Sequence, residues 1–269
     1  MPGSWNGTGI RWCDETWNPI HGCSKSGSPG CANCYAERVS RKFGNTTEPW
    51  LPANAEANVQ LKPHKLDELE SLPTPSWVFV NSMSDLFHEL VPDDFIRDVY
   101  AAIEARPRSA FQILTKHGAD GGRDALEPPA NVMLGVSVGH PEWRYRIDWL
   151  RAQNAHTKFV SFEPLVECIP GTDLDLTGID WAIVGGESGP DESRREMDPA
   201  WARNVVRACW RQDVAVFFKQ HSGPRPESDV MLDFRDGWGP RRIEEFPELP
   251  DGIVPAPREF LGAEQEVFA

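Results

Sequence analysis

The chain has 269 residues, 40% of them hydrophobic, and a formal net charge of −14. A chain of this length can bury a full core, and we expect one domain. It has no apolar stretch long enough to span a bilayer, and its first residues lack the basic and apolar regions of a secretory signal. We therefore expect a cytoplasmic protein with no membrane contact. The acidic charge disfavours, without excluding, binding to a nucleic-acid backbone.

Six short apolar runs recur along the chain, and they are rich in β-branched and aromatic residues. Continuous runs of this kind are typical of strands that are buried on both faces. Segments with helical periodicity separate several of them, which predicts βαβ units. We therefore predict an α/β fold, a partial (β/α) barrel of six to seven mostly parallel strands. The runs are 77–80, 111–114, 132–138, 159–162, 181–184 and 214–218, and the helical segments are 93–105, 143–151 and 198–211.

Two regions break this alternation. Residues 44–76 are polar and rich in proline, and we expect them to form an insertion over one face of the barrel. From residue 223 onward the chain is rich in Pro, Gly and Glu and has no long periodic segment. The predicted organisation is a barrel over residues 1–222 with an irregular C-terminal extension, 223–269, packed on it.

Polar residues follow or close all six apolar runs. Because the carboxyl ends of parallel strands meet at one edge of a sheet, these residues are expected to share a site there. Taken singly, each is explained as well by a turn or a helix cap. They include Asn81, Ser82, Ser84, Asp85, Thr115, Lys116, Ser137, Ser161, Glu163, Glu187, Ser188, Lys219 and Gln220.

Three of the six cysteines, Cys23, Cys31 and Cys34, form a C-x7-C-x2-C pattern around a turn-forming stretch. In a reducing compartment, clustered cysteines bind metal more often than they form disulfides. Three thiolates can hold a 4Fe–4S cluster and leave its fourth iron open. A structural zinc site with His21 as the fourth ligand, or three buried thiols, are the alternatives that the spacing leaves open. We do not expect the other cysteines, Cys13, Cys168 and Cys209, to be ligands.

The loop ends in C-x2-C-Y-A and precedes a plausible helix, which resembles the cluster loop of radical S-adenosylmethionine enzymes. Blocks within residues 16–220 further resemble an uncharacterised, phage-associated family with radical-SAM-like features. The first cysteine interval, seven residues, departs from the common C-x3-C-x2-C spacing. The blocks are W-N-P-I-H-G-C, V-N-S-M-S-D-L-F-H-E, F-Q-I-L-T-K, G-V-S-V, S-F-E-P-L, I-V-G-G-E-S-G and F-F-K-Q.

This resemblance implies an enzyme in which a 4Fe–4S cluster, held by Cys23, Cys31 and Cys34, cleaves S-adenosylmethionine to a 5′-deoxyadenosyl radical that abstracts hydrogen. It also implies an electron donor such as flavodoxin or ferredoxin. Phage association implies the host cytoplasm and a nucleotide or modified DNA base as the substrate. The alternative function is a non-catalytic, zinc-stabilised α/β protein that binds a nucleotide or a partner.

Further roles are expected for the strand-end residues. The resemblance places Asn81, Ser82, Ser84 and Asp85 at the S-adenosylmethionine amino group, and Ser137 at its ribose. Gly185 and Gly186 allow a close backbone approach, and Glu163 needs a ligand or a basic partner such as Lys116. Lys116 and Lys219 suit an anionic group, whereas Trp17, Tyr35 or His21 suit stacking on a base. The expected catalytic set is Lys116, Glu163, Glu187 and Lys219, and the expected cofactor-binding set is Asn81, Ser82, Ser84, Asp85, Ser137, Glu163, Gly185 and Gly186.

Overall fold

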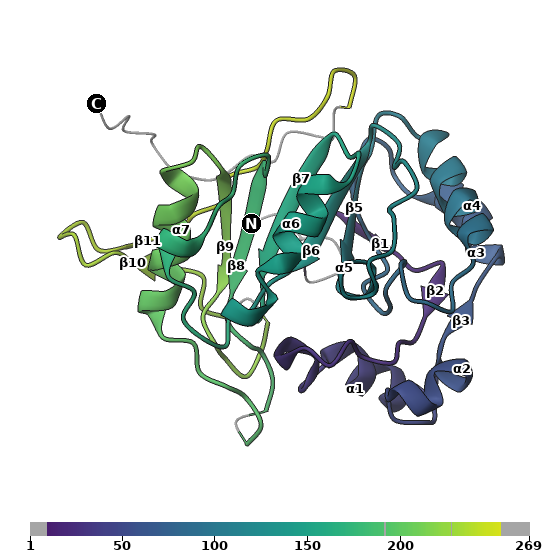
Figure 1. Ribbon diagram of the computed structural model, residues 1–269, viewed down its shortest axis with the longest axis horizontal. Coiled ribbons are helices and arrows are strands. Elements are labelled where there is room, and N and C mark those ends of the chain that lie inside the picture. Colours follow the sequence, from purple (N-terminus) through teal and green to yellow (C-terminus); the bar gives the residue numbers. More distant parts are fainter. Residues whose placement is uncertain (1–9, 191, 227, 254–269) are drawn as a thin grey trace, which may run out of the picture.

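The computed structural model describes residues 10–190, 192–226 and 228–253. Its seven-stranded sheet has the order β1-β4-β5-β6-β7-β8-β9, and every neighbouring pair is parallel. Because each strand lies beside the preceding one, the sheet curls into a half-barrel (Figure 1). The predicted partial (β/α) barrel is confirmed. The strands are β1 (Glu15–Trp17), β4 (Trp77–Val80), β5 (Ala110–Thr115), β6 (Val132–Ser137), β7 (Thr157–Phe162), β8 (Trp181–Gly185) and β9 (Ala215–Gln220).

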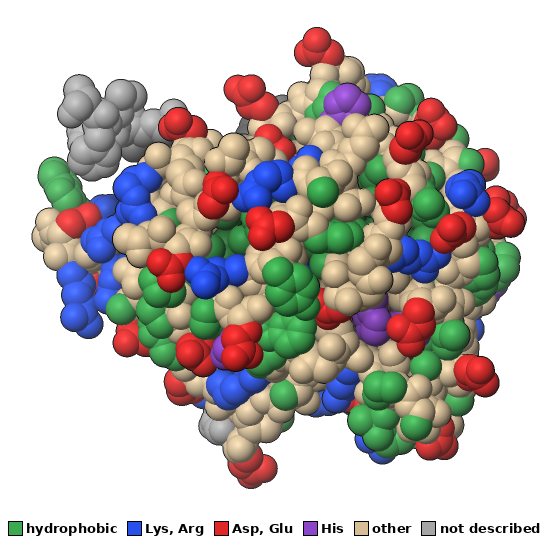
Figure 2. All heavy atoms as spheres, in the orientation of Figure 1, with side chains coloured by type: hydrophobic (Ala, Val, Ile, Leu, Met, Phe, Trp, Pro, Cys, Tyr) green, Lys and Arg blue, Asp and Glu red, His purple; other side chains and the backbone are tan. Residues whose placement is uncertain are grey.

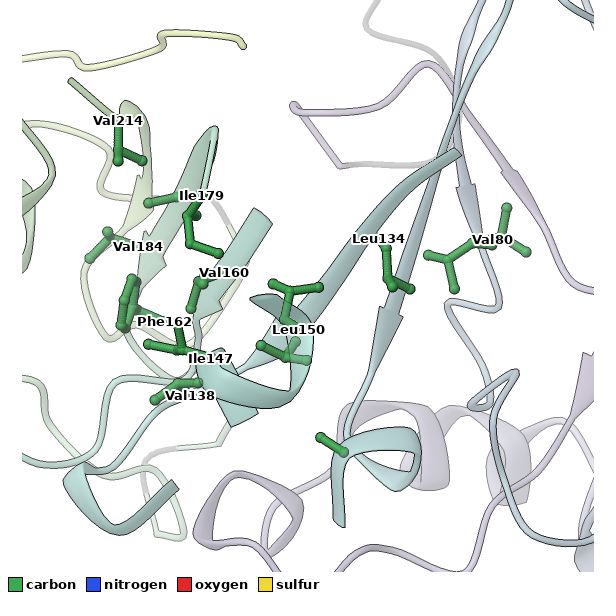
Figure 3. Close-up of a cluster of buried hydrophobic side chains, with 14 of the residues drawn as sticks. Val80, Leu134, Val138, Ile147, Leu150, Val160, Phe162, Ile179, Val184 and Val214 are labelled. Atoms are coloured by element: carbon green, nitrogen blue, oxygen red, sulfur yellow. The ribbon is translucent and has the colours of Figure 1, made fainter. Parts of the chain in front are cut away.

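Helices cover the outer, convex face of the sheet (Figure 1). Val160 points from its strand into this layer and lies near Ile147 and Leu150 of the covering helix (Figure 3). The last of these helices begins at Asp198, whose side chain accepts a hydrogen bond from a backbone N–H of the first turn. The helices between the strands are α4 (Asp93–Glu104), α5 (His117–Gly121), α6 (Tyr145–Ala152) and α7 (Pro199–Trp210).

Aromatic side chains fill the concave side of the sheet. Trp77 and Trp181 stand at the beginnings of their strands, with Phe159 and Phe217 beside them. Phe246, from the C-terminal segment, stacks on Trp181 with ring centroids 5.4 Å apart. This aromatic plug occupies the amino-terminal half of the half-barrel, so only the carboxyl ends of the strands are left for a site.

Short elements make up the two regions outside the alternating pattern. Residues 44–76 flank the β1 edge, and β3 pairs antiparallel with β2. Residues 223–253 run past β9, where Phe218 N–H donates to Ile243 O at 2.9 Å. Among the described residues, no helix is long and apolar enough to cross a membrane. The remaining elements are β2 (Ile20–His21), η1 (Pro29–Cys31), α1 (Tyr35–Lys42), η2 (Pro52–Asn54), α2 (Ala55–Asn58), β3 (Gln60–Leu61), α3 (His64–Glu68), η3 (Leu69–Ser71), η4 (Pro141–Trp143), η5 (Gly171–Asp173), β10 (Leu232–Asp233) and β11 (Pro240–Arg241).

The plug packs against the backbone of β6 at Gly135. A Cβ at this position would lie 2.4 Å from Phe159 Cζ. We expect Gly135→Ala to lower the free energy of unfolding by about 1–3 kcal/mol, because the ring must leave its place in the plug. The matched control is Gly121→Ala in α5, where a Cβ would meet nothing within 4 Å. That change should be neutral or stabilising by up to about 1 kcal/mol. Urea denaturation measures both, and equal midpoints for Gly135→Ala and the wild type would contradict this packing.

Candidate functional site

One layer of polar side chains lies above the aromatic plug. Successive side chains of a strand point to opposite faces of a sheet. Met133 and Phe159 face the concave interior, so Ser137 and Glu163, each four residues further on, face the same side. Lys219 of β9 lies on that side as well, beside an irregularity in the β8–β9 register, because it contacts Glu163. Ser137, Glu163 and Lys219 thus lie on the same side of the sheet.

Glu163 and Lys219 form an ion pair across this layer, with Glu163 Oε1 and Lys219 Nζ 2.5 Å apart. Their strands, β7 and β9, are separated by β8. The β8 residue at this level is Gly185, where a Cβ would lie 3.5 Å from Glu163 Oε1. The two side chains meet over the glycine because no side chain stands between them. Glu163 therefore has a basic partner, as expected, but this partner is Lys219 and not Lys116.

The three cysteines lie on the loop between β2 and α1, at the carboxyl edge of the sheet. Burial and the charge of Asp85 raise the pKa of Cys23, and the charges of Cys31 and Cys34 add to this shift. The pKa of Cys31 is lowered instead, because the Lys116 cation and hydrogen bonding to Ser28 outweigh burial. The thiols are thus close enough to influence one another's ionisation. Among the described residues, no group of three or more His, Cys, Asp or Glu side chains is close enough together to hold a metal ion.

Two histidines with adjacent, tilted rings hold the first turn of this loop. Cys23 Sγ lies 3.3 Å from His117 Nε2, and the His117 and His88 rings are 4.4 Å apart. His88 Nδ1 accepts a hydrogen bond from Leu90 N–H, so its Nε2 carries the proton and donates to Ser24 Oγ at 2.8 Å. Burial and the neighbouring His117 lower the pKa of His88, which keeps that ring neutral.

The Asp85 carboxylate holds the two loops that carry His88 and His117 beside the cysteine loop. The carboxylate accepts hydrogen bonds from Thr115 Oγ1 at 2.7 Å and from the backbone N–H groups of Lys116, His117 and Phe87 at 2.8, 3.1 and 3.0 Å. Four donors occupy the acceptor positions of a carboxylate. The structure therefore gives Asp85 a role in fixing the loops after β4 and β5, in place of the expected contact to an ammonium group.

The neighbouring residues of the β4 loop bind the segment before the cysteines. Ser82 Oγ donates to Asn18 Oδ1 at 3.1 Å, and Ser84 Oγ donates to Ile20 O at 2.9 Å. Asn81 Oδ1 accepts from Ile20 N–H, whereas its buried Nδ2 has no partner among the described residues. Of the residues in this loop that are expected to bind the cofactor, Asn81 thus has an amide N–H donor that no described residue uses.

Glu187 connects the cysteine loop to the end of β8. Its Oε2 accepts from Asn33 Nδ2 at 3.0 Å and from Arg195 N–H at 2.8 Å, and the Arg195 guanidinium completes the pair at 2.5 Å. These contacts outweigh burial and lower the pKa of Glu187. Because Asn33 precedes Cys34, Glu187 and the thiols lie on the same edge. At Gly186 the close approach is to the protein itself, since a Cβ would lie 2.5 Å from Ser222 N.

A hollow of about 210 Å³, which counts space open to solvent, lies between the cysteine loop and the strand ends. Ser137 Oγ and Trp143 Nε1 are buried and have no hydrogen-bond partner among the described residues. Lys116 likewise has no side-chain hydrogen bond or ion pair there. The residues that line the hollow include Ser28, Lys116, Ser137, Trp143, Arg146 and Glu163.

Trp17 and His21 belong to a second hollow, which they share with Lys65 of α3. Trp17 is 3% exposed, and its Nε1 donates to Lys65 O at 2.7 Å. The expectation that Trp17 stacks on a base is wrong, because its ring is part of the core. Tyr35 is 47% exposed and donates its hydroxyl to Ser82 O at 2.6 Å. Of the remaining cysteines, Cys13 and Cys209 are buried and Cys168 is half-buried.

The model of one protein family, described as "Protein of unknown function (DUF5131)", matches residues 7–239. The chain belongs to this family. The match covers the cysteine loop, the polar layer and all seven strands of the half-barrel. No match was found among the curated proteins or the solved structures.

The structure adds functional candidates that the sequence reasoning missed. His117 directly follows the strand-end residue Lys116, and His88 lies in the D-L-F-H-E block after the strand 77–80. Their position in a segment that follows a strand was the sequence signal available for both histidines. Asn33 lies inside the cysteine motif itself. No sequence signal distinguished Trp143, since its unpartnered Nε1 depends on tertiary packing.

Asp85→Asn tests the anchoring of the loops. We expect the variant to lose about 2–4 kcal/mol of unfolding free energy at pH 7, because hydrogen bonds to a buried charge are lost or weakened. Burial opposes ionisation, but the charge of His117 and the hydrogen bonds from Thr115 Oγ1 and the backbone N–H groups of Lys116 and His117 lower the pKa of Asp85. The stabilisation is therefore present above about pH 4 and is lost as the pH falls through the lowered pKa. Denaturation from pH 7 to 3 should show the difference from wild type shrinking. The exposed Asp94→Asn is the matched control, and an Asp85 variant as stable as this control would refute the assignment.

Proposed function

We propose that this protein is a radical S-adenosylmethionine enzyme whose 4Fe–4S cluster is held by Cys23, Cys31 and Cys34. The observation that carries the proposal is the position of the three thiols on one loop, at the carboxyl edge of a parallel half-barrel. This edge is where α/β barrels build their active sites. A hollow with unpartnered polar atoms lies beside the loop.

The thiol loop fits a cluster in its chemistry and its anchoring. Each thiolate of a cluster binds a different iron, so the thiols need a common loop and a common face. Lys116 favours the thiolate form of Cys31. The loop is fixed from three sides, by His117 at Cys23, by Asn33 and Glu187 near Cys34, and by Lys25, whose Nζ lies 2.6 Å from Glu37 of α1. These contacts suit a bulky inorganic centre that must be held without strain.

A cluster held by Cys23, Cys31 and Cys34 would supply the electron that cleaves a carbon–sulfur bond of S-adenosylmethionine, which would give methionine and a 5′-deoxyadenosyl radical able to take hydrogen from the substrate. The chain's own residues position the reactants. The Glu163–Lys219 pair forms the floor of the site, and Asn81 offers a free amide donor. The aromatic plug closes the barrel below the polar layer and keeps water from entering there.

The partners of this reaction follow from the same proposal. The electron comes from a donor such as flavodoxin or ferredoxin. The proposed substrate is a nucleotide or a DNA base, and Tyr35 is the exposed ring at this edge that can stack on it. The net charge of −14 favours a small substrate over a long polyanion.

Metal analysis of cysteine variants tests the cluster assignment. We expect protein that is reconstituted without oxygen to be brown, with about four irons and four sulfides per chain. Alanine at Cys23, Cys31 or Cys34 should abolish this content, because each thiolate holds one corner. Cys168→Ala is the matched control, since Cys168 is half-buried and lies outside the loop. It should keep full iron and sulfide.

Two results would overturn the assignment. One is full cluster content in Cys31→Ala. The other is colourless wild-type protein with one zinc per chain, lost on His21→Ala, which would establish the structural zinc site instead.

A further inference from the structure

We propose that Lys116, Ser137 and Trp143 form an oxyanion-binding site that takes a carboxylate or phosphate group in the hollow beside Cys31. The proposal deepens the proposed function and rests on it for the identity of the ligand. The binding itself needs no cluster, so the two ideas can fail separately.

Two hydrogen-bond donors of the site have no acceptor among the described residues. Ser137 is 2% exposed and faces the concave side, and its hydroxyl has no partner among the described residues. The buried Trp143 Nε1–H, which can only donate, also lacks a partner in the described chain. Leaving such groups unpaired costs free energy, and a bound acceptor removes that cost.

Lys116 supplies the charge. The two other cations near the hollow are already neutralised, since Lys219 pairs with Glu163 and Arg146 pairs with Asp120 at 2.6 Å. The side chain of Lys116 has neither an ion pair nor a hydrogen bond among the described residues. The only acid lining the hollow, within the part of the chain that the structure describes, is the paired Glu163. Of the Lys and Arg side chains that line the hollow in the described chain, Lys116 is thus the one without an ion pair to a carboxylate.

Arg146 holds the donors in place without binding the ligand itself. Its Nη1 donates to Ser137 O at 2.7 Å, and its guanidinium lies 4.3 Å from the centroid of the Trp143 ring. The donor set is thus organised before a ligand arrives, which lowers the entropy cost of binding.

The size of the hollow favours the binding of part of a charged group over the binding of a whole ligand. The space that the centre of a water-sized atom can occupy in the hollow is only about 10 Å³, and its roughly 210 Å³ of empty volume includes open solvent. On the face shown in Figure 2, acidic and basic side chains are interspersed, with no broad basic area. One oxygen of the oxyanion therefore enters the hollow, and the rest of a small ligand lies outside it. That oxyanion is the carboxylate of S-adenosylmethionine or the phosphate of a nucleotide substrate.

Calorimetry with paired ligands tests the site and distinguishes the two sources. Adenosine monophosphate is compared with adenosine on the full chain without a cluster, and S-adenosylmethionine with 5′-methylthioadenosine, which lacks the carboxylate, on the chain before and after reconstitution. We expect the charged member of at least one pair to bind more tightly. Lys116→Gln should weaken that member at least about tenfold, and Ser137→Ala or Trp143→Phe about fivefold. The uncharged members should be unaffected.

The controls are Lys65→Gln, at the second hollow, and Trp149→Phe, whose Nε1 already donates to Arg123 O. Both should bind like the wild type. If the three variants weaken the binding of adenosine monophosphate alone, the site binds a phosphate. If they weaken the binding of S-adenosylmethionine alone, the site binds its carboxylate. Equal affinities within both pairs, or charged ligands that bind the three variants as tightly as the wild type, overturn the proposal. Iron content, measured on the same preparations, reports separately on the cluster.

Discussion

The packing of the aromatic plug determines which end of the concave side is left for a site. Trp77, Phe159, Trp181 and Phe217 fill the amino-terminal half of the concave side, and Phe246 from the C-terminal segment closes it. Strand alternation then places polar side chains in the next layers along the same face. Because the plug occupies the space below, every ligand must approach from the carboxyl edge, where the cysteine loop lies.

Hydrogen bonding to the loops on that edge explains why the three cysteines stand together. Asp85 joins the loops after β4 and β5 through four donors, and His88 and His117 extend from those loops to the first cysteine turn. Glu187 reaches the last turn from β8 through Asn33. Hydrogen bonds from both sides of the half-barrel thus hold the cysteine loop, which has almost no regular secondary structure. Such preorganisation is what a bound metal centre requires of its ligands.

The sequence predicted the fold well because the apolar pattern of each run agrees with the burial of the strand that it forms. All six apolar runs became strands of the sheet, and the run 77–80 coincides with β4. β1 is short, with only Trp17 fully buried, so its pattern was too weak to detect. Side-chain partners were predicted less well. Glu163 meets Lys219 only because Gly185 lies between them, and the free Nε1 of Trp143 results from packing that no local pattern encodes. The cysteine spacing singled out the loop, whereas the histidines that hold it come from distant segments.

In the proposed enzyme, the cluster would keep one iron open for S-adenosylmethionine. The most direct measurement is the electron paramagnetic resonance spectrum of the reduced, reconstituted protein with and without S-adenosylmethionine. We predict a reduced 4Fe–4S signal whose g-values shift when S-adenosylmethionine is added, together with formation of 5′-deoxyadenosine. A cluster signal that S-adenosylmethionine leaves unchanged, with no 5′-deoxyadenosine formed, would contradict the claim.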